Sequence, residues 1–166
     1  MKLRASTLAL LLLLAALGAF VWTTSLALPP VVASHFSAAG AANGFMPRGA
    51  YIATMLVLII GVPALLAALP TWIAARSGSN LRIPHREHWL APERRAGTFA
   101  FIGAHGRWFA AGVALFLADV HWLVVQANRL QPPALATGAI QGALVAFFVA
   151  LAIWLFTLFR RFRLPD

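Results

Sequence analysis

The 166-residue sequence contains no cysteine and only four acidic residues. Without thiols the chain can form no disulfide, cysteine-ligated zinc site, iron–sulfur cluster or thiol nucleophile. It also has no H-E-x-x-H or G-x-S-x-G motif, no phosphate-binding glycine loop and no pair of neighbouring carboxylates. Because these are the usual residue patterns of enzymes, we expect a non-enzymatic protein without a cofactor.

Apolar side chains make up most of the sequence. Hydrophobic residues account for 61% of the chain and charged residues for 10%, and the mean hydropathy is +0.83. A soluble domain carries roughly 25% charged residues, so this composition predicts a membrane protein. The net charge of +9 would indicate nucleic-acid binding in a soluble protein. Here the arginines lie at the ends of apolar runs, where they determine membrane topology, and we expect no nucleic-acid partner.

Four apolar runs are long enough to cross the roughly 30 Å hydrocarbon core of a bilayer as helices. They cover residues 8–28, 51–73, 108–128 and 137–159, with a cap at 29–50 and an inner loop at 74–107. The predicted fold is a single integral membrane domain over residues 1–166. It is an all-α membrane protein, an antiparallel four-transmembrane-helix bundle with a small extracytoplasmic cap loop and a cytoplasmic interfacial helix.

The first run has an alternative interpretation as a secretory signal peptide, because Ser25-Leu26-Ala27 resembles a cleavage site. Signal cores usually span about 7–15 residues, and this run is longer, so we expect a retained helix. In the second run, Gly61 and Pro63 predict a kink. Pro92-Glu93 predicts the start of the interfacial helix that precedes the third span.

Turn-forming residues define the cap. Pro29-Pro30 end the first helix, and residues 31–36 form a β-prone run. Gly40 supplies a bend, and Asn43-Gly44 is the dipeptide that most favours a tight hairpin turn. We therefore predict a hairpin-like or irregular cap on the membrane surface, turning at Asn43-Gly44.

Basic residues are divided unevenly between the two sides of the predicted bundle. If both termini are cytoplasmic, the outer side holds Arg48 and Arg129, and the inner side holds the other eleven, namely Lys2, Arg4, Arg76, Arg82, Arg86, Arg94, Arg95, Arg107, Arg160, Arg161 and Arg163. This asymmetry follows the positive-inside rule. We predict a multi-pass protein with both termini cytoplasmic and the cap outside.

Two segments resemble the motifs of a known family. They are the cap pattern Leu28-Pro29, His35-Phe36, Gly40, Asn43-Gly44 and Arg48, and the inner-loop run from Ile83 to Arg94, which includes Pro84, Trp89, Pro92, Glu93 and Arg94. Together they resemble an uncharacterised bacterial membrane-protein family, a domain of unknown function, whose segment also occurs in SdpI-type immunity proteins. Asn43 stands where an acid is usual and His88 where an aromatic is usual. The resemblance implies a protein of the bacterial inner (plasma) membrane in toxin immunity or envelope signalling, and it supplies no catalytic residue.

Five polar residues fall within the third and fourth runs: Asp119, His121, Gln126, Asn128 and Gln141. A carboxylate in a span costs about 2.5–3.5 kcal/mol, so Asp119 should face other helices, protonated or paired. Gln126 shares its face, whereas His121 and Asn128 lie about 160° round the helix. Asp119 is either a proton relay or cation site, or a packing residue hydrogen-bonded to a neighbouring helix, which we favour. For His121 we favour a structural role.

Outside the spans, histidines are the main candidate site residues. His35 in the cap is either a pH-sensing or ligand-binding group, or is hydrogen-bonded to the loop backbone, which we favour. His85 and His88 with Glu87 have the spacing of metal ligands, but no second pair accompanies them, so we expect a solvated or interfacial face and no metal. The arginines around them favour contact with anionic lipid headgroups.

These residues support three functional hypotheses. In the first, the protein recognises a ligand, peptide or protein partner through its cap, with His35, Phe36, Gly40, Asn43, Gly44 and Arg48 as recognition residues. In the second, it is a small transporter or channel component with a polar path along Asp119, Gln126 and Gln141. In the third, it is an oligomer or an accessory subunit whose small-residue face at Gly138, Gly142 and Ala146 packs against partners. We favour recognition.

Overall fold

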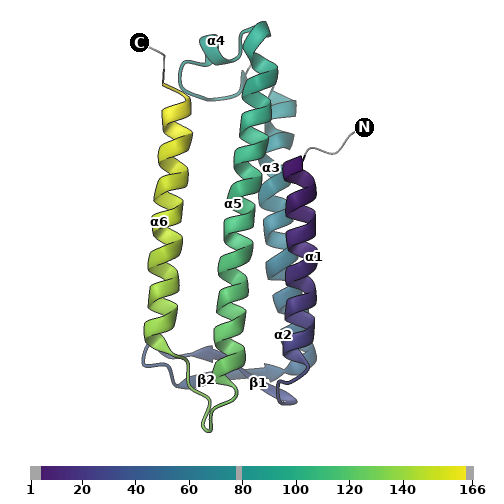
Figure 1. Cartoon of the computed structure of the whole chain (residues 1–166), viewed down its shortest axis with the longest axis vertical. Helices are drawn as coiled ribbons and strands as arrows, with labels where there is room; N and C mark the ends of the chain where they lie inside the picture. Colours follow the sequence, from purple (N-terminus) through teal and green to yellow (C-terminus); the bar gives the residue numbers. More distant parts are fainter. Residues whose placement is uncertain (1–4, 78–79, 164–166) are drawn as a thin grey trace.

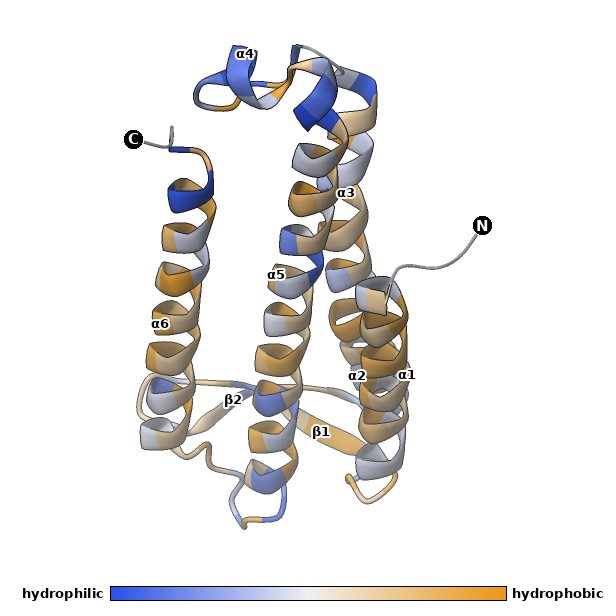
Figure 2. Cartoon of the chain, turned by 45° about the horizontal axis from the view of Figure 1, so that its top comes forward, coloured by the Kyte–Doolittle hydropathy of each residue, from blue (hydrophilic) through white to orange (hydrophobic). Residues whose placement is uncertain are grey.

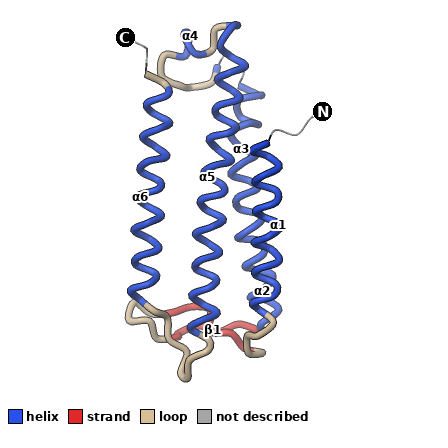
Figure 3. Tube along the Cα trace, in the orientation of Figure 1, coloured by secondary structure: helices blue, strands red, loops and turns tan. Residues whose placement is uncertain are grey.

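The structure, a computed structural model, describes residues 5–77 and 80–163, so the predicted inner-side residues Lys2 and Arg4 lie outside the described residues. The chain is built almost entirely of helices, with one hairpin across one end (Figures 1 and 3). In chain order the elements are α1 (Ala5–Ser25), β1 (Val31–Phe36), β2 (Ala42–Pro47), α2 (Arg48–Leu56), the π-helix η1 (Val57–Gly61), α3 (Val62–Ser77), α4 (Arg86–Trp89), α5 (Pro92–Ala127) and α6 (Thr137–Arg161).

Within the described residues, four helical segments are long and apolar enough to cross a membrane: α1, the continuous run of α2, η1 and α3 from Arg48 to Ser77, α5 and α6. α1 and α6 are mostly apolar along their length, whereas α5 also carries hydrophilic stretches between its ends (Figure 2). This agrees with the predicted all-α membrane class. We refer below to the hairpin end and to the opposite α4 end.

The second apolar helix is interrupted where Gly61 and Pro63 were expected to disturb it. The interruption is a π-helical turn, Val57–Gly61, which ends two residues before Pro63. Proline has no N–H to donate to the preceding turn, and a wider turn accommodates that missing hydrogen bond. Pro70 lies farther along, inside α3.

The third apolar helix differs from the prediction. Pro92 does begin a helix, but that helix is α5 itself, which continues without a break for 36 residues to Ala127. At 1.5 Å per residue it is about 54 Å long, well beyond the thickness of a hydrocarbon core. The expected separate interfacial helix before the third span is therefore wrong: the segment from Pro92 to Arg107 contains no proline after its first residue, and it continues along α3.

The cap is an antiparallel hairpin, but it turns at a different place from the one predicted. Asn43-Gly44 lies inside β2, where Gly44 pairs with His35, and the chain reverses at residues 37–41. Gly40 has a φ of +84°, a left-handed conformation that glycine adopts without strain, and this closes the turn. Gly44 is needed in the strand because a Cβ there would lie 2.9 Å from the Cβ of His35.

The tightest helix packing joins α3 to α5. A Cβ on Gly106 would lie 3.0 Å from the Pro70 ring, and one on Gly103 would lie 2.8 Å from the Thr71 side chain, so the two backbones approach closely. Farther along α5, Ala110 and Ala114 are fully buried against α1 residues Leu10 and Leu14. By contrast, none of the residues that the structure describes in α6 is buried. The core is thus formed by α1, the continuous run of α2, η1 and α3, and α5, with β1 packed at the hairpin end, and α6 stands beside α5 (Figure 1).

Candidate functional site

The hairpin is held to the bundle by the side chain of Asn128, at the end of α5. Its Oδ1 accepts a hydrogen bond from the Ala33 N–H at 2.9 Å, and its Nδ2 donates to the Ala33 carbonyl at 2.9 Å and to the Val124 carbonyl. The amide thus pairs with the free edge of β1 as another strand would. Asn128, predicted as an intramembrane polar residue, thus anchors the hairpin to the end of α5.

Arg48 forms a second anchor. Its Nη1 donates to the carbonyls of Leu26 at 3.2 Å and Leu28 at 2.9 Å, just past the end of α1. A cation next to carbonyls at a helix C-terminus is favourable, because these groups have no partner within the helix. The guanidinium that the sequence placed among recognition residues therefore joins the end of α1 to the start of α2.

The tip of the hairpin docks on the loop between α5 and α6. The Leu135 N–H donates to the Gly40 carbonyl at 2.8 Å, and Ala41 forms a bridge with Ala134. A Cβ on Gly40 would also collide with the Leu135 carbonyl oxygen. Gly40 is therefore required both for the turn and for this contact, and the hairpin is fixed at its tip as well as along β1.

One set of hairpin side chains remains outside these contacts. Val31 is 59% exposed and Phe45 58% exposed, and His35 and Asn43 are exposed with them. Phe36, in contrast, packs against the core. Among the described residues the His35 ring bonds the neighbouring Ser34 hydroxyl, at 3.1 Å, and not the loop backbone as expected. We call Val31, His35, Asn43 and Phe45 the outer face of the hairpin.

Directly beneath the hairpin lies a buried polar cluster around His121, which is fully buried. Its Nε2 lies 2.8 Å from the Thr24 hydroxyl and its Nδ1 lies 2.9 Å from the Tyr51 hydroxyl. The Thr24 hydroxyl donates to the Phe20 carbonyl at 2.6 Å, so it accepts from Nε2, and Nδ1 then accepts from Tyr51. Every polar atom of the ring is satisfied, which supports the predicted structural role of His121.

Sequence reasoning missed the two hydroxyl partners of His121. Thr24 lies at the end of a long apolar run and Tyr51, the one tyrosine of the sequence, at the start of another. Each is a polar group in an apolar span, where it needs a hydrogen-bond partner. The sequence could therefore have predicted that these hydroxyls pair with another intramembrane polar residue. Tyr51 also packs with Val32 of β1 in one core cluster, so the polar cluster and the hairpin share a base.

Asp119 does not belong to the polar cluster around His121. It is exposed, away from buried His121, as their spacing predicted. However, it forms no hydrogen bond or ion pair with any residue in the described ranges 5–77 and 80–163, so the favoured role as a packing residue bonded to a neighbouring helix is wrong. The reason is that α6 presents small side chains to α5 near Asp119. The middle of α6 carries no hydrogen-bond donor that reaches the carboxylate. No bond within the described chain links Asp119 to half-buried Gln126 or to exposed Gln141.

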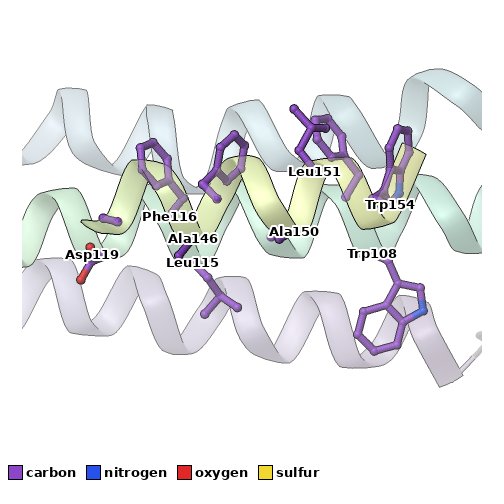
Figure 4. Close-up of a pocket in the computed structure, with 12 residues that line it drawn as sticks. Trp108, Leu115, Phe116, Asp119, Ala146, Ala150, Leu151 and Trp154 are labelled. Carbon is purple, nitrogen blue, oxygen red and sulfur yellow. The ribbon is translucent and has the colours of Figure 1, made fainter. Parts of the chain in front are cut away.

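A groove runs between α5 and α6, with Asp119 at one end and Trp154 at the other (Figure 4). Its volume is about 420 Å³, and it is lined mainly by aromatic and small side chains. Among the predicted small-residue positions, Ala146 lines this groove, whereas Cβ atoms on Gly138 and Gly142 would meet nothing within 4 Å. The small-residue face of α6 therefore remains open in the described chain.

The inner-loop motif is used to hold the α4 end together. The Trp89 Nε1 donates to the Phe162 carbonyl at 3.3 Å, and the Arg161 guanidinium lies 4.1 Å from the Trp89 ring centroid. The Trp89 carbonyl accepts from the Thr98 hydroxyl at 2.8 Å. Of the other motif residues, Pro92 begins α5, Glu93 is exposed, Arg94 reaches the His88 carbonyl at 3.4 Å, and Pro84 is exposed.

Metal ligands do not converge at this loop. His85 has a left-handed backbone, with φ of 49°, immediately before α4. No group of three or more His, Cys, Asp or Glu side chains that could hold a metal ion occurs in the part of the chain that the structure describes.

Comparisons of the chain with protein-family models, with curated proteins and with solved structures found no match. The function must therefore be inferred from the residues of this chain.

Proposed function

We propose that this protein is a non-enzymatic integral membrane protein that recognises a peptide or protein partner through the outer face of its hairpin. The proposed setting is a bacterial inner membrane, which the chain crosses four times as an antiparallel bundle with both termini cytoplasmic and the hairpin outside. The immunity or envelope-signalling role implied by the family resemblance fits this arrangement, because a toxin or signal peptide would approach from the hairpin side.

One observation carries the proposal: the hairpin is anchored at three places, yet it leaves apolar side chains exposed. Asn128, Arg48 and the Gly40–Leu135 contact hold it in place. Exposed Val31 and Phe45 make no contribution to this anchoring. A rigid surface carrying apolar and polar groups binds a partner at a low entropic cost, because the surface is already ordered. Large apolar side chains on such a surface are typical of interaction sites.

Photo-cross-linking tests this proposal. A photoreactive phenylalanine analogue at position 45 should give a protein adduct of discrete mass in native membranes. The matched control is the same analogue at Phe156, which is equally exposed, at 59%, but lies on α6 in the predicted lipid region. The adduct from position 45 should fall when Asn128→Ala releases the hairpin. Identical labelling from both positions, or lipid adducts alone, would contradict recognition through the hairpin.

A further inference from the structure

The intramembrane carboxylate of Asp119 has no partner in the described chain, and this raises the question of what neutralises it. A charged carboxylate in the middle of a span costs about 2.5–3.5 kcal/mol on insertion scales. The residues at 5–77 and 80–163 give it no hydrogen bond and no ion pair. The compensating group is therefore a proton or a group that does not belong to the described residues.

The surface next to Asp119 is already shaped to receive such a group. The groove between α5 and α6 has a volume of about 420 Å³, within the range of about 300–1,000 Å³ typical of small-molecule sites. It stays open because Gly112 on α5 faces Ala143, Ala146 and Ala150 on α6, none of which fills the space. Apart from Asp119, the side chains labelled in Figure 4 are apolar or aromatic.

Aromatic residues line both of the hollows that Asp119 borders. Phe116 and Phe147 stand together in the groove, with ring centroids 4.7 Å apart. On the α1 side, Asp119 borders a second hollow with Phe20 and Trp122, whose centroids are 6.0 Å apart. Faces of aromatic rings attract cations, and a carboxylate adds a full opposite charge. This combination selects a positively charged ligand.

The same surroundings determine which kind of cation fits. Metal ions such as Ca²⁺ or Mg²⁺ require several oxygen ligands, and Asp119 is the one acid in the groove. Giving up a hydration shell for a mostly hydrocarbon surface is unfavourable for a small ion. An organic cation whose charge is surrounded by apolar groups has little hydration to lose and fills the groove with its own apolar surface.

We propose that the groove between α5 and α6 is a binding site for a lipophilic organic cation, with Asp119 as its counter-ion. The ligand enters sideways from the lipid phase, because the groove opens along the outside of the bundle between the two helices. This site is separate from the outer face of the hairpin, so the proposal does not depend on the recognition function.

Tetraphenylphosphonium tests the proposal, with purified full-length protein in lipid nanodiscs and empty nanodiscs as the blank. We expect saturable binding that weakens by about tenfold or more in Asp119→Asn, because the paired charge is largely removed from water. The matched control is Glu93→Gln, which removes an exposed carboxylate from the same helix outside the groove and should leave binding unchanged. Tetraphenylborate, which has the same shape and the opposite charge, should not bind saturably.

A groove-filling variant provides an independent measurement. Ala146→Phe places a ring in the groove and should also abolish saturable binding, while circular dichroism shows unchanged helix content. The proposal is overturned if Asp119→Asn binds tetraphenylphosphonium as well as the unaltered protein does, or if tetraphenylborate binds equally well.

A second copy of the chain is the competing occupant. Since the chain has no cysteine, the thiol introduced by Leu115→Cys on the same exposed face of α5 is unique. Efficient disulfide cross-linking between two copies through that thiol would show that the groove is an oligomer interface and would overturn the ligand site. Protection of the thiol from maleimide by tetraphenylphosphonium would support it.

Discussion

At the scale of single residues, two buried polar side chains, Asn128 and His121, have partners that lie far away in the sequence. Asn128 bonds Ala33, and His121 bonds Thr24 and Tyr51. In an apolar environment an unpaired polar group costs free energy, so these pairs determine which segments must lie together. The carboxylate of Asp119, in contrast, is exposed within a predicted span and has no hydrogen-bond or ion-pair partner among the described residues, and for that reason it is the strongest indication of a ligand.

Asn128→Ala tests the anchoring of the hairpin. We expect the free energy of unfolding to fall by about 1–3 kcal/mol, because the buried N–H and C=O of Ala33 lose their partner. The measurement is thermal or denaturant unfolding in detergent, followed by circular dichroism. The matched control is Asn43→Ala, since Asn43 is exposed and has no hydrogen bond within the described residues, and it should change stability by less than about 0.5 kcal/mol. Equal effects of the two variants would rule out Asn128 as the anchor.

At the scale of helices and strands, glycines have opposite effects according to what they face. Gly103 and Gly106 allow α5 to approach α3, whereas Gly97, near the start of the same helix, has nothing within 4 Å of its missing Cβ. Glycine destabilises a helix because it loses more conformational freedom on folding than other residues do. Close packing against a neighbouring helix offsets this loss of stability. The seam between α3 and α5 thus explains two glycines but not the third.

Alanine substitutions at Gly106 and Gly97 separate these effects. Gly106→Ala should lower the free energy of unfolding by about 1–2 kcal/mol, because its Cβ would press on the rigid Pro70 ring. Gly97→Ala should raise it by about 0.5–1 kcal/mol, because alanine favours the helix and meets no neighbour. Both variants are compared by unfolding in the same detergent. If Gly106→Ala is as stable as Gly97→Ala, then α3 and α5 are not packed closely at this point.

The same elements show what the sequence could predict. The long apolar runs predicted the four helices that are long and apolar enough to span a membrane. The β-prone run at residues 31–36 predicted β1, and Pro92 predicted the start of a helix. The extension of α5 was missed because the arginines between Pro92 and Arg107 indicated a surface segment, although a helix continues into water when a neighbour supports it. The turn was misplaced because Asn43-Gly44 has the stronger local preference, while contacts with Leu135 and His35 decide the position of each glycine. Such contacts join segments that are distant in the sequence, and no local pattern encodes them.

At the scale of the whole molecule, α6 is held at both of its ends. It also packs on α5 in the half nearer α4, whereas the half nearer the hairpin borders the open groove. The hairpin tip contacts the loop before it through Leu135, and Trp89 contacts its far end through Phe162. In the half nearer α4, Trp154 Nε1 donates to the His105 carbonyl at 3.0 Å, and the two rings stack with centroids 4.5 Å apart. The hairpin and the inner loop therefore both position α6, and the groove with Asp119 lies between these supports.

The orientation of this assembly in the membrane is the last property to be tested. The hairpin end carries Arg48 and Arg129, whereas the opposite end carries most of the other basic residues of the chain. Positively charged segments are retained on the cytoplasmic side during insertion, which places the hairpin outside.

Because the chain has no cysteine, a single introduced thiol reports its own side of the membrane. In intact cells an impermeant maleimide should label Asn43→Cys, and it should label Glu87→Cys only after the membrane is opened. Val149→Cys, on the apolar outside of α6, serves as the control that should remain unlabelled in both conditions. The reverse pattern at positions 43 and 87 would place the hairpin in the cytoplasm, where no toxin or envelope signal could reach it from outside.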